Sequence, residues 1–110
     1  MVCALVFVGS AVASAPPVGP LPKAQVTTLK TTRGSYFSVT APVRGGGYVW
    51  RVARAYNARV VGQVGEADVG KTVVLVFKAT GRGRTSIVLG ETKGETAKAY
   101  RAIRYDVTVY

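Results

Sequence analysis

The sequence has 110 residues, which suits one domain and is short for an enzyme built on a parallel sheet flanked by helices. Hydrophobic residues make up 48% of the chain, enough to bury a core, and 15 Lys and Arg outnumber 5 Asp and Glu. The net charge of +10 favours acidic partners, and the lack of histidine excludes the usual nucleophile–base pairs and most zinc sites.

The first 15 residues are typical of an export signal. "VCALVFVG" is an apolar run too short to cross a bilayer as a helix, and "SAVASAPP" follows it. Ala11 and Ala13, or Ala13 and Ala15, fit a small-x-small cleavage site, so we expect residues 1–15 to be a signal peptide. A buried first strand is the alternative. Cleavage would remove Cys3, leave no thiol, and make the protein secreted or exported, either extracellular or periplasmic.

Residues 16–24 contain "PPVGPLPK", whose four prolines exclude a helix or an inner strand and predict an extended linker. The domain then spans residues 25–110 and alternates apolar and polar positions in short runs separated by turn residues. We expect strands at 26–31, 36–41, 48–55, 58–64, 71–79, 85–90 and 103–110. A short helix is possible within Glu95 to Ala102.

About seven short strands without a sustained 3.6-residue apolar period predict an all-β fold, an immunoglobulin-like two-sheet β-sandwich. Trp50 is expected to be the largest buried side chain. The predicted core comprises Phe37, Val39, Trp50, Leu75, Phe77, Leu89, Tyr105 and Val107.

The stretch "GEADVGKT", Gly65 to Thr72, matches the phosphate-binding pattern G-x-x-x-x-G-K-[ST]. That loop needs a strand before it and a helix after it, with the helix N-terminus aimed at the phosphates. Here Lys71 and Thr72 lead into "VVLVF", a β-branched run that disfavours a helix. We therefore expect a loop between two strands, with no nucleotide bound and no cofactor.

The order of elements resembles the chagasin-type cysteine-protease inhibitors. "TTLKTTRGSYFSVTAPVRGGGYVW" is similar to the family's opening of strand, glycine turn, strand ending in proline, glycine loop and aromatic-x-Trp. "KTVVLVFKATGRGRTSIVLG" and "IRYDVTVY" resemble its later strands. The likeness covers about the last four-fifths of the chain.

This resemblance implies three loops clustered at one end of the sandwich, which plug the active-site cleft of papain-like cysteine proteases without covalent chemistry. The partner would be such a protease, bound by a monomer that is not itself an enzyme. The loops would run from Arg44 to Tyr48, from Gly65 to Gly70 and from Glu91 to Gly94. The implied binding residues are Arg44, Gly45, Gly46, Gly47, Tyr48, Gly65, Glu66, Ala67, Asp68, Gly70, Thr92, Lys93 and Gly94.

Two of these loops depart from the family pattern. "VRGGG" lacks the usual Asn, Pro and Thr, and "ETKGETAKA" keeps a basic Lys93 without an aromatic anchor, so we expect inhibition weaker than a typical member's. Glu66 and Asp68 would also place negative charge near a catalytic thiolate. Glu91 and Glu95 are expected to face solvent, and no metal site is expected.

Two other functions are compatible with the sequence. One is an immunoglobulin-like surface-binding or adhesion module that has the fold and lacks the inhibition. The other is a basic binder of nucleic acid or another polyanion, with Arg51 and Arg104 on an outer sheet face. Nucleic acid is the less expected partner, since export argues against it.

Overall fold

The computed structural model describes residues 16–110, so the expected signal peptide at 1–15 lies outside the described residues. Seven strands follow one another without a helix in this part of the chain. They are β2 (Gln25–Thr31), β3 (Tyr36–Pro42), β4 (Tyr48–Val52), β5 (Val61–Val69), β6 (Thr72–Ala79), β7 (Gly83–Lys93) and β8 (Ala99–Val109). Among residues 16–110 there is accordingly no long apolar helix that could span a membrane.

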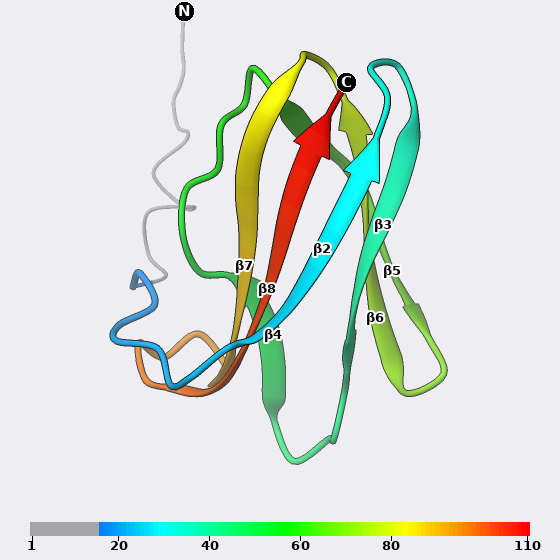
Figure 1. Cartoon of the computed structure of the whole chain (residues 1–110). Coiled ribbons are helices and arrows are strands. Elements are labelled where there is room, and N and C mark those ends of the chain that lie inside the picture. The colour runs from blue at the N-terminus through cyan, green and yellow to red at the C-terminus, as the bar shows by residue number, and fades with distance from the viewer. Residues whose placement is uncertain (1–15) are drawn as a thin grey trace, which may run out of the picture.

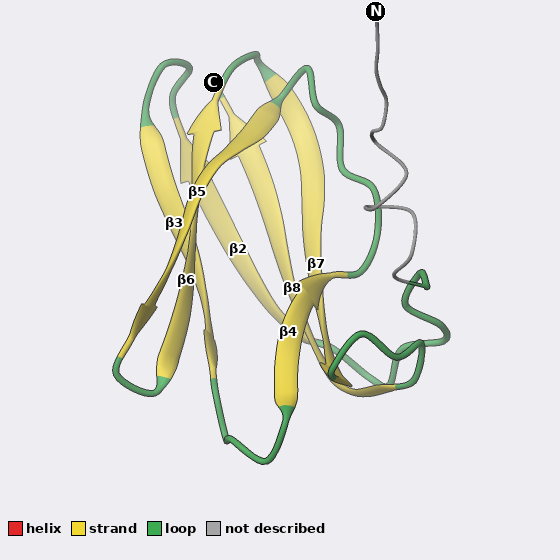
Figure 2. Cartoon of the chain, turned by 180° about the vertical axis from the view of Figure 1, so that it is seen from behind, coloured by secondary structure: helices red, strands yellow, loops and turns green. Residues whose placement is uncertain are grey.

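The strands form two sheets packed face to face, one ordered β2-β8-β7-β4 and the other β3-β6-β5 (Figure 1). Neighbouring strands run antiparallel, except that β2 pairs with β8 in parallel. Figure 2 shows from behind that β4 and β5 are edge strands of the two sheets on the same side of the molecule. The all-β, two-sheet sandwich predicted from the sequence is confirmed.

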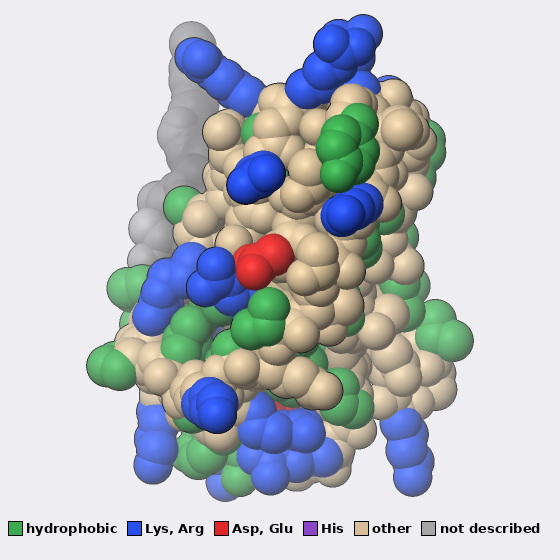
Figure 3. Space-filling view, in the orientation of Figure 1, with side chains coloured by type: hydrophobic (Ala, Val, Ile, Leu, Met, Phe, Trp, Pro, Cys, Tyr) green, Lys and Arg blue, Asp and Glu red, His purple; other side chains and the backbone are tan. Residues whose placement is uncertain are grey.

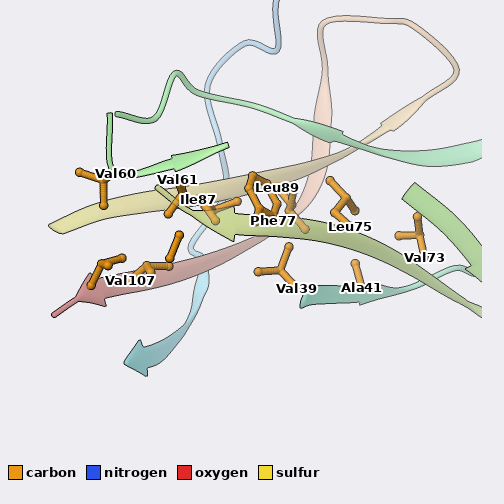
Figure 4. Close-up of a cluster of buried hydrophobic side chains, with 12 residues drawn as sticks. Val39, Ala41, Val60, Val61, Val73, Leu75, Phe77, Ile87, Leu89 and Val107 are labelled. Carbon is orange, nitrogen blue, oxygen red and sulfur yellow. The ribbon is translucent and has the colours of Figure 1, made fainter. Parts of the chain in front are cut away.

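The core lies between the sheets and follows from the two-residue period of a strand. In β6, the central strand of its sheet, Val73, Leu75, Phe77 and Ala79 are buried and the residues between them are half-buried. They meet Val39 and Ala41 from β3 and aliphatic side chains from β7 and β8 (Figure 4). Leu89 and Val107 of the expected core are also buried.

Three of the expected core residues are less buried than predicted. Phe37, Trp50 and Tyr105 are half-buried and pack against the core from its rim, and Phe77 is the largest fully buried side chain. Each ring with a polar atom uses it to join the sheets. The Trp50 Nε1 donates to the Pro42 carbonyl at 2.8 Å, and the Tyr105 hydroxyl donates to the Thr40 carbonyl at 3.0 Å.

The boundaries of four strands differ clearly from the expected ones. The strand expected at 48–55 ends at Val52. The strand expected at 58–64 begins at Val61 and continues to Val69, and β7 runs well past Gly90 to Lys93. The possible helix within Glu95 to Ala102 is wrong, because β8 begins at Ala99 and pairs with β7. Ladder hydrogen bonds to a neighbouring strand override the weak helical tendency of this short alanine-containing segment.

The proline-rich segment forms neither helix nor strand, yet it lies against the folded domain. Val18 is buried, the Gly19 amide donates to the Ala97 carbonyl at 2.7 Å, and Arg54 donates to the Val18 and Gly19 carbonyls at 3.0 and 2.9 Å. A Cβ atom at Gly90 would lie 3.1 Å from Leu21, tighter than ordinary contact. The glycine thus lets the segment pack on the outer face of β7.

Candidate functional site

Three connections meet at one end of the sandwich: residues 43–47 between β3 and β4, the turn between β5 and β6, and residues 94–98 between β7 and β8 (Figure 2). Two backbone hydrogen bonds hold them together. The Val43 amide donates to the Lys71 carbonyl at 2.8 Å, and the Gly94 amide donates to the Gly47 carbonyl at 2.8 Å. The first connection therefore lies between the other two and is bonded to both. We call these three connections the loop end.

The first connection is shaped by its glycines. Gly45, Gly46 and Gly47 have φ angles of 76°, 67° and 85°, a left-handed run that residues with a Cβ adopt only with strain. Tyr48, predicted to be a loop residue, begins β4, and its amide donates to the Gly45 carbonyl at 3.2 Å. The run forms a narrow, exposed backbone turn without side chains.

The second connection is shorter than predicted. The expected loop from Gly65 to Gly70 is wrong, because Gly65, Glu66, Ala67 and Asp68 belong to β5 and pair with β6 up to the Val69–Thr72 pair. Only Gly70 and Lys71 form the turn, and Gly70 has a φ of 62°. A register shift between Gln63 and Gly65 inserts a bulge at Val64. Beyond it, Glu66 and Asp68 pair with the inward-facing Leu75 and Val73.

The third connection also begins later than expected. Glu91, Thr92 and Lys93 end β7, and the loop proper spans residues 94–98. Thr92, predicted to bind a partner, is buried, and its hydroxyl donates to the Gly94 carbonyl at 2.6 Å. Lys93 is exposed at the rim, and Gly94, with a φ of 63°, turns the chain away from the strand. Thr92 therefore shapes the loop from within.

Glu91 is the largest correction at this end. It was expected to face solvent, but its exposed fraction is 0%. Its Oε1 accepts from Arg44 at 2.8 Å and from Arg101 Nε at 3.0 Å, and its Oε2 accepts from Arg101 Nη2 at 2.7 Å. One carboxylate thus joins the first connection to β8. These partners offset the desolvation that would otherwise neutralise a buried carboxylate.

The hydrogen bonds from Arg101, reinforced by its charge and by Arg44, hold the pKa of Glu91 below its usual value despite the opposing effect of burial. The same pairing raises the pKa of Arg101. Glu91 and Arg101 therefore stay charged at neutral pH. Arg44, bonded to the same carboxylate, holds the first connection against the sheet.

Basic and aromatic side chains alternate on the surface of the loop end. The Arg44 guanidinium lies 3.8 Å from the centre of the Tyr48 ring, and the Lys93 ammonium lies 5.8 Å from it. Tyr48 contacts Tyr100 edge to face at 5.2 Å, and the Lys98 ammonium lies 5.0 Å from the Tyr100 ring. Cation–π contacts of this kind fix long basic side chains without neutralising their charge.

Sequence analysis did not find the roles of Glu91, Lys98, Tyr100 and Arg101. It placed Glu91 in the third loop as a solvent-facing charge and did not assign the other three to this site. A signal for two of them was available in the two-residue period. Ile87 and Leu89 point inward in β7, and continuing the pattern places Glu91 inward as well. In β8, Ile103 and Tyr105 pack against the core. Extending this two-residue period toward the start of the strand places Arg101 on the same inward face.

A groove of about 360 Å³ lies beside the loop end, between the edge strand β4 and the β5–β6 hairpin. Aromatic side chains of β4 line one wall, and the carboxylates of β5 line the other. The lining residues are Val43, Tyr48, Val49, Trp50, Glu66, Asp68, Gly70 and Val73. The sandwich is unfilled here because β5 carries charges at inward positions after its bulge.

The motif Gly65 to Thr72 forms a strand, a two-residue turn and the start of the next strand. Thr72 opens β6, so the helix N-terminus that cradles phosphate in a P-loop does not follow this motif. Within residues 16–110 no three His, Cys, Asp or Glu side chains gather where they could hold a metal ion.

No protein-family model and no curated protein matches this sequence. Among solved structures, the fold is similar to the crystal structure of the cysteine protease inhibitor EhICP2 from Entamoeba histolytica, with a TM-score of 0.60. The match covers 81% of this chain and 99% of that chain at 15% sequence identity. What the two chains share is therefore the β-sandwich architecture on which that inhibitor is built.

Proposed function

We propose that this protein inhibits papain-like cysteine proteases by inserting its loop end into the active-site cleft. The observation that carries the proposal is the bonded arrangement of the three connections, in which Val43 pairs with Lys71 and Gly94 with Gly47. A rigid wedge loses little conformational entropy on binding, which favours affinity. The fold shared with EhICP2 supports the same function.

The parts of the wedge would have different roles. The exposed run from Gly45 to Gly47 has no side chains, so its backbone can approach a catalytic thiol closely. Gly70 and Lys71 form a second narrow ridge beside it. Glu66 and Asp68 lie in β5 behind that turn and line the groove, so we place Lys71 ahead of the carboxylates in the complex. Blocking would be steric.

A matched pair of substitutions tests this proposal. Lys71→Trp adds bulk to the two-residue turn at the loop end. Arg82→Trp makes the same change of charge and also introduces a Trp in the turn between β6 and β7, at the opposite end. The inhibition constant of the full chain against papain is measured with a fluorogenic peptide substrate.

We expect the parent chain to inhibit competitively, Lys71→Trp to weaken inhibition about tenfold or more, and Arg82→Trp to leave it unchanged. The proposal fails if papain keeps full activity in excess inhibitor, or if Arg82→Trp is the more damaging change.

A further inference from the structure

A second surface lies away from the loop end, on the outer face of β2, β8 and β7. It is a hollow of about 450 Å³, lined by Thr28, Arg84, Thr85, Ser86, Arg104, Asp106, Val107 and Thr108. Figure 3 shows this side of the molecule with a single acidic patch in its middle and basic side chains around it. We call this surface the sheet-face hollow.

The pairing of the strands places residues of β2, β8 and β7 side by side in rows across the hollow. Thr108 of β8 pairs with Arg84 of β7 on one side and with Lys30 of β2 on the other. In the next row, Asp106 lies between Ser86 and Thr28. Side chains directly opposite one another in a sheet point to the same face, so two cations and a set of hydroxyls surround the carboxylate of Asp106.

That carboxylate is already paired within the protein. Asp106 Oδ1 accepts from Arg104 Nε at 2.7 Å and from the Ser86 hydroxyl at 2.8 Å. The bond from Arg104, helped by that from Ser86, lowers the pKa of Asp106, so it stays ionised and orients the guanidinium. The terminal nitrogens of Arg104 have no hydrogen-bond partner among residues 16–110, and neither do the side chains of Arg84 and Lys30.

Three exposed cations around one satisfied carboxylate give the hollow a positive charge suited to an anion. Guanidinium groups donate two parallel hydrogen bonds to a sulfate or carboxylate, and Thr and Ser hydroxyls can bond to sugar hydroxyls. None of the described residues that line the hollow has an aromatic ring on which a base could stack. The chemistry therefore favours a charged sugar polymer over nucleic acid.

We propose that the sheet-face hollow binds a sulfated polysaccharide, independently of the protease-binding loop end. Such a ligand would hold the protein at a polysaccharide-coated surface while the loop end stays free, because the hollow lies along the strands and the loops lie at their ends. This site goes beyond the proposed inhibition.

The test uses the full chain and a heparin octasaccharide as the probe, with affinity measured by isothermal titration calorimetry at physiological salt. The variant Lys30→Ala/Arg84→Ala removes two charges from the hollow and keeps the Arg104–Asp106 pair. The variant Lys71→Ala/Lys93→Ala removes two exposed charges from the loop end and serves as the control of equal net charge.

We expect the hollow variant to bind heparin at least about tenfold more weakly than the parent, and the control to stay within about threefold. Inhibition of papain by the hollow variant should be unchanged, which separates this proposal from the first. Equal losses in both variants would reveal general charge attraction and overturn the site. Absent heparin binding, or equally tight binding of an oligothymidine strand, would overturn the ligand class.

Discussion

The two ends of the sandwich are held together by different kinds of interaction. At the end where β8 finishes, aliphatic side chains such as Val60, Val61 and Val109 close the space between the sheets. At the loop end that filling is replaced by the charged cluster of Glu91 with Arg44 and Arg101. The chain crosses from one kind of packing to the other within single strands, as in β7, where Leu89 is followed two residues later by Glu91.

In this protein, one kind of interaction supplies most of the stability and the other fixes the geometry of the loops. Apolar burial gives a large free energy that depends little on direction, which suits a core. Hydrogen-bonded charges give a smaller net free energy because both partners lose water, but they hold groups in one geometry. At the loop end, Glu91 therefore fixes the positions of Arg44 and Arg101 by hydrogen bonds, which a leucine at this position could not do.

The strongest contrast between the two ends should appear on truncating one aromatic side chain from each. Phe77 is fully buried and stacks on Phe37 at 5.7 Å, so Phe77→Ala should lower the free energy of unfolding by about 3–5 kcal/mol. Trp50 is half-buried beside the groove, and Trp50→Ala should cost less, about 1–3 kcal/mol. Urea denaturation followed by circular dichroism measures both. A larger loss for Trp50→Ala would mean that the loop end carries the main core.

The charged cluster gives a second, smaller effect that depends on pH. Glu91→Gln leaves Arg44 and Arg101 without a counter-charge, but their side chains are 45% and 41% exposed, which limits the cost to about 1–3 kcal/mol at neutral pH. The pKa of Glu91 is lowered in the folded protein, so its stabilisation is present above the usual glutamate value of 4.5 and is lost as pH falls through the folded pKa.

Urea unfolding at pH 7 and again at about pH 3 measures this difference. The difference in the free energy of unfolding between the parent and Glu91→Gln should be smaller at about pH 3 than at pH 7. As a control, Glu95→Gln in the exposed loop should have the same free energy of unfolding as the parent at both pH values. If the difference in the free energy of unfolding were the same at both pH values, the charge of the Glu91 carboxylate would not contribute to stability.

A third comparison sharpens the role of backbone shape at the loop end. Gly45 has a φ of 76° and nothing within 4 Å of where a Cβ would lie, so Gly45→Ala should cost about 1–2 kcal/mol through the backbone alone. Gly62 in β5 also has open space, but its φ lies outside the left-handed region, and Gly62→Ala should change stability by less than about 0.5 kcal/mol. Thermal unfolding of the two variants measures this difference. Equal decreases in Tm for Gly45→Ala and Gly62→Ala would argue against backbone strain at Gly45.

The sheets could be predicted from sequence because their signals are local. The alternation in "IRYDVTVY" is set by neighbours two residues apart, and it identified the inward face of β8 correctly. The near-continuous apolar run in "KTVVLVFKA" is typical of a strand central to the core, and β6 is the central strand of its sheet. The two-sheet sandwich then followed from the number of strands and turns.

The site was harder to predict because its features depend on residues far apart. Gly65 and Gly70 suggested a loop between them, whereas the bulge at Val64 lets β5 keep pairing as far as Val69. Charge suggested an exposed Glu91, whereas Arg44 lies 47 positions earlier in the sequence and Arg101 lies 10 positions later. The two-residue period places Glu91 and Arg101 inward, but it does not show that they bond to each other or that Arg44 joins them.

The parallel pairing of β2 with β8 has a consequence for how the protein folds. Gln25 lies beside Ile103 and Thr31 beside Val109, so within residues 16–110 the first strand, β2, pairs only with the last one, β8. Closing so large a loop costs entropy before any contact compensates for it, and it slows folding. While the protein is being synthesised, β2 therefore has no sheet partner among residues 16–110 until β8 has been made.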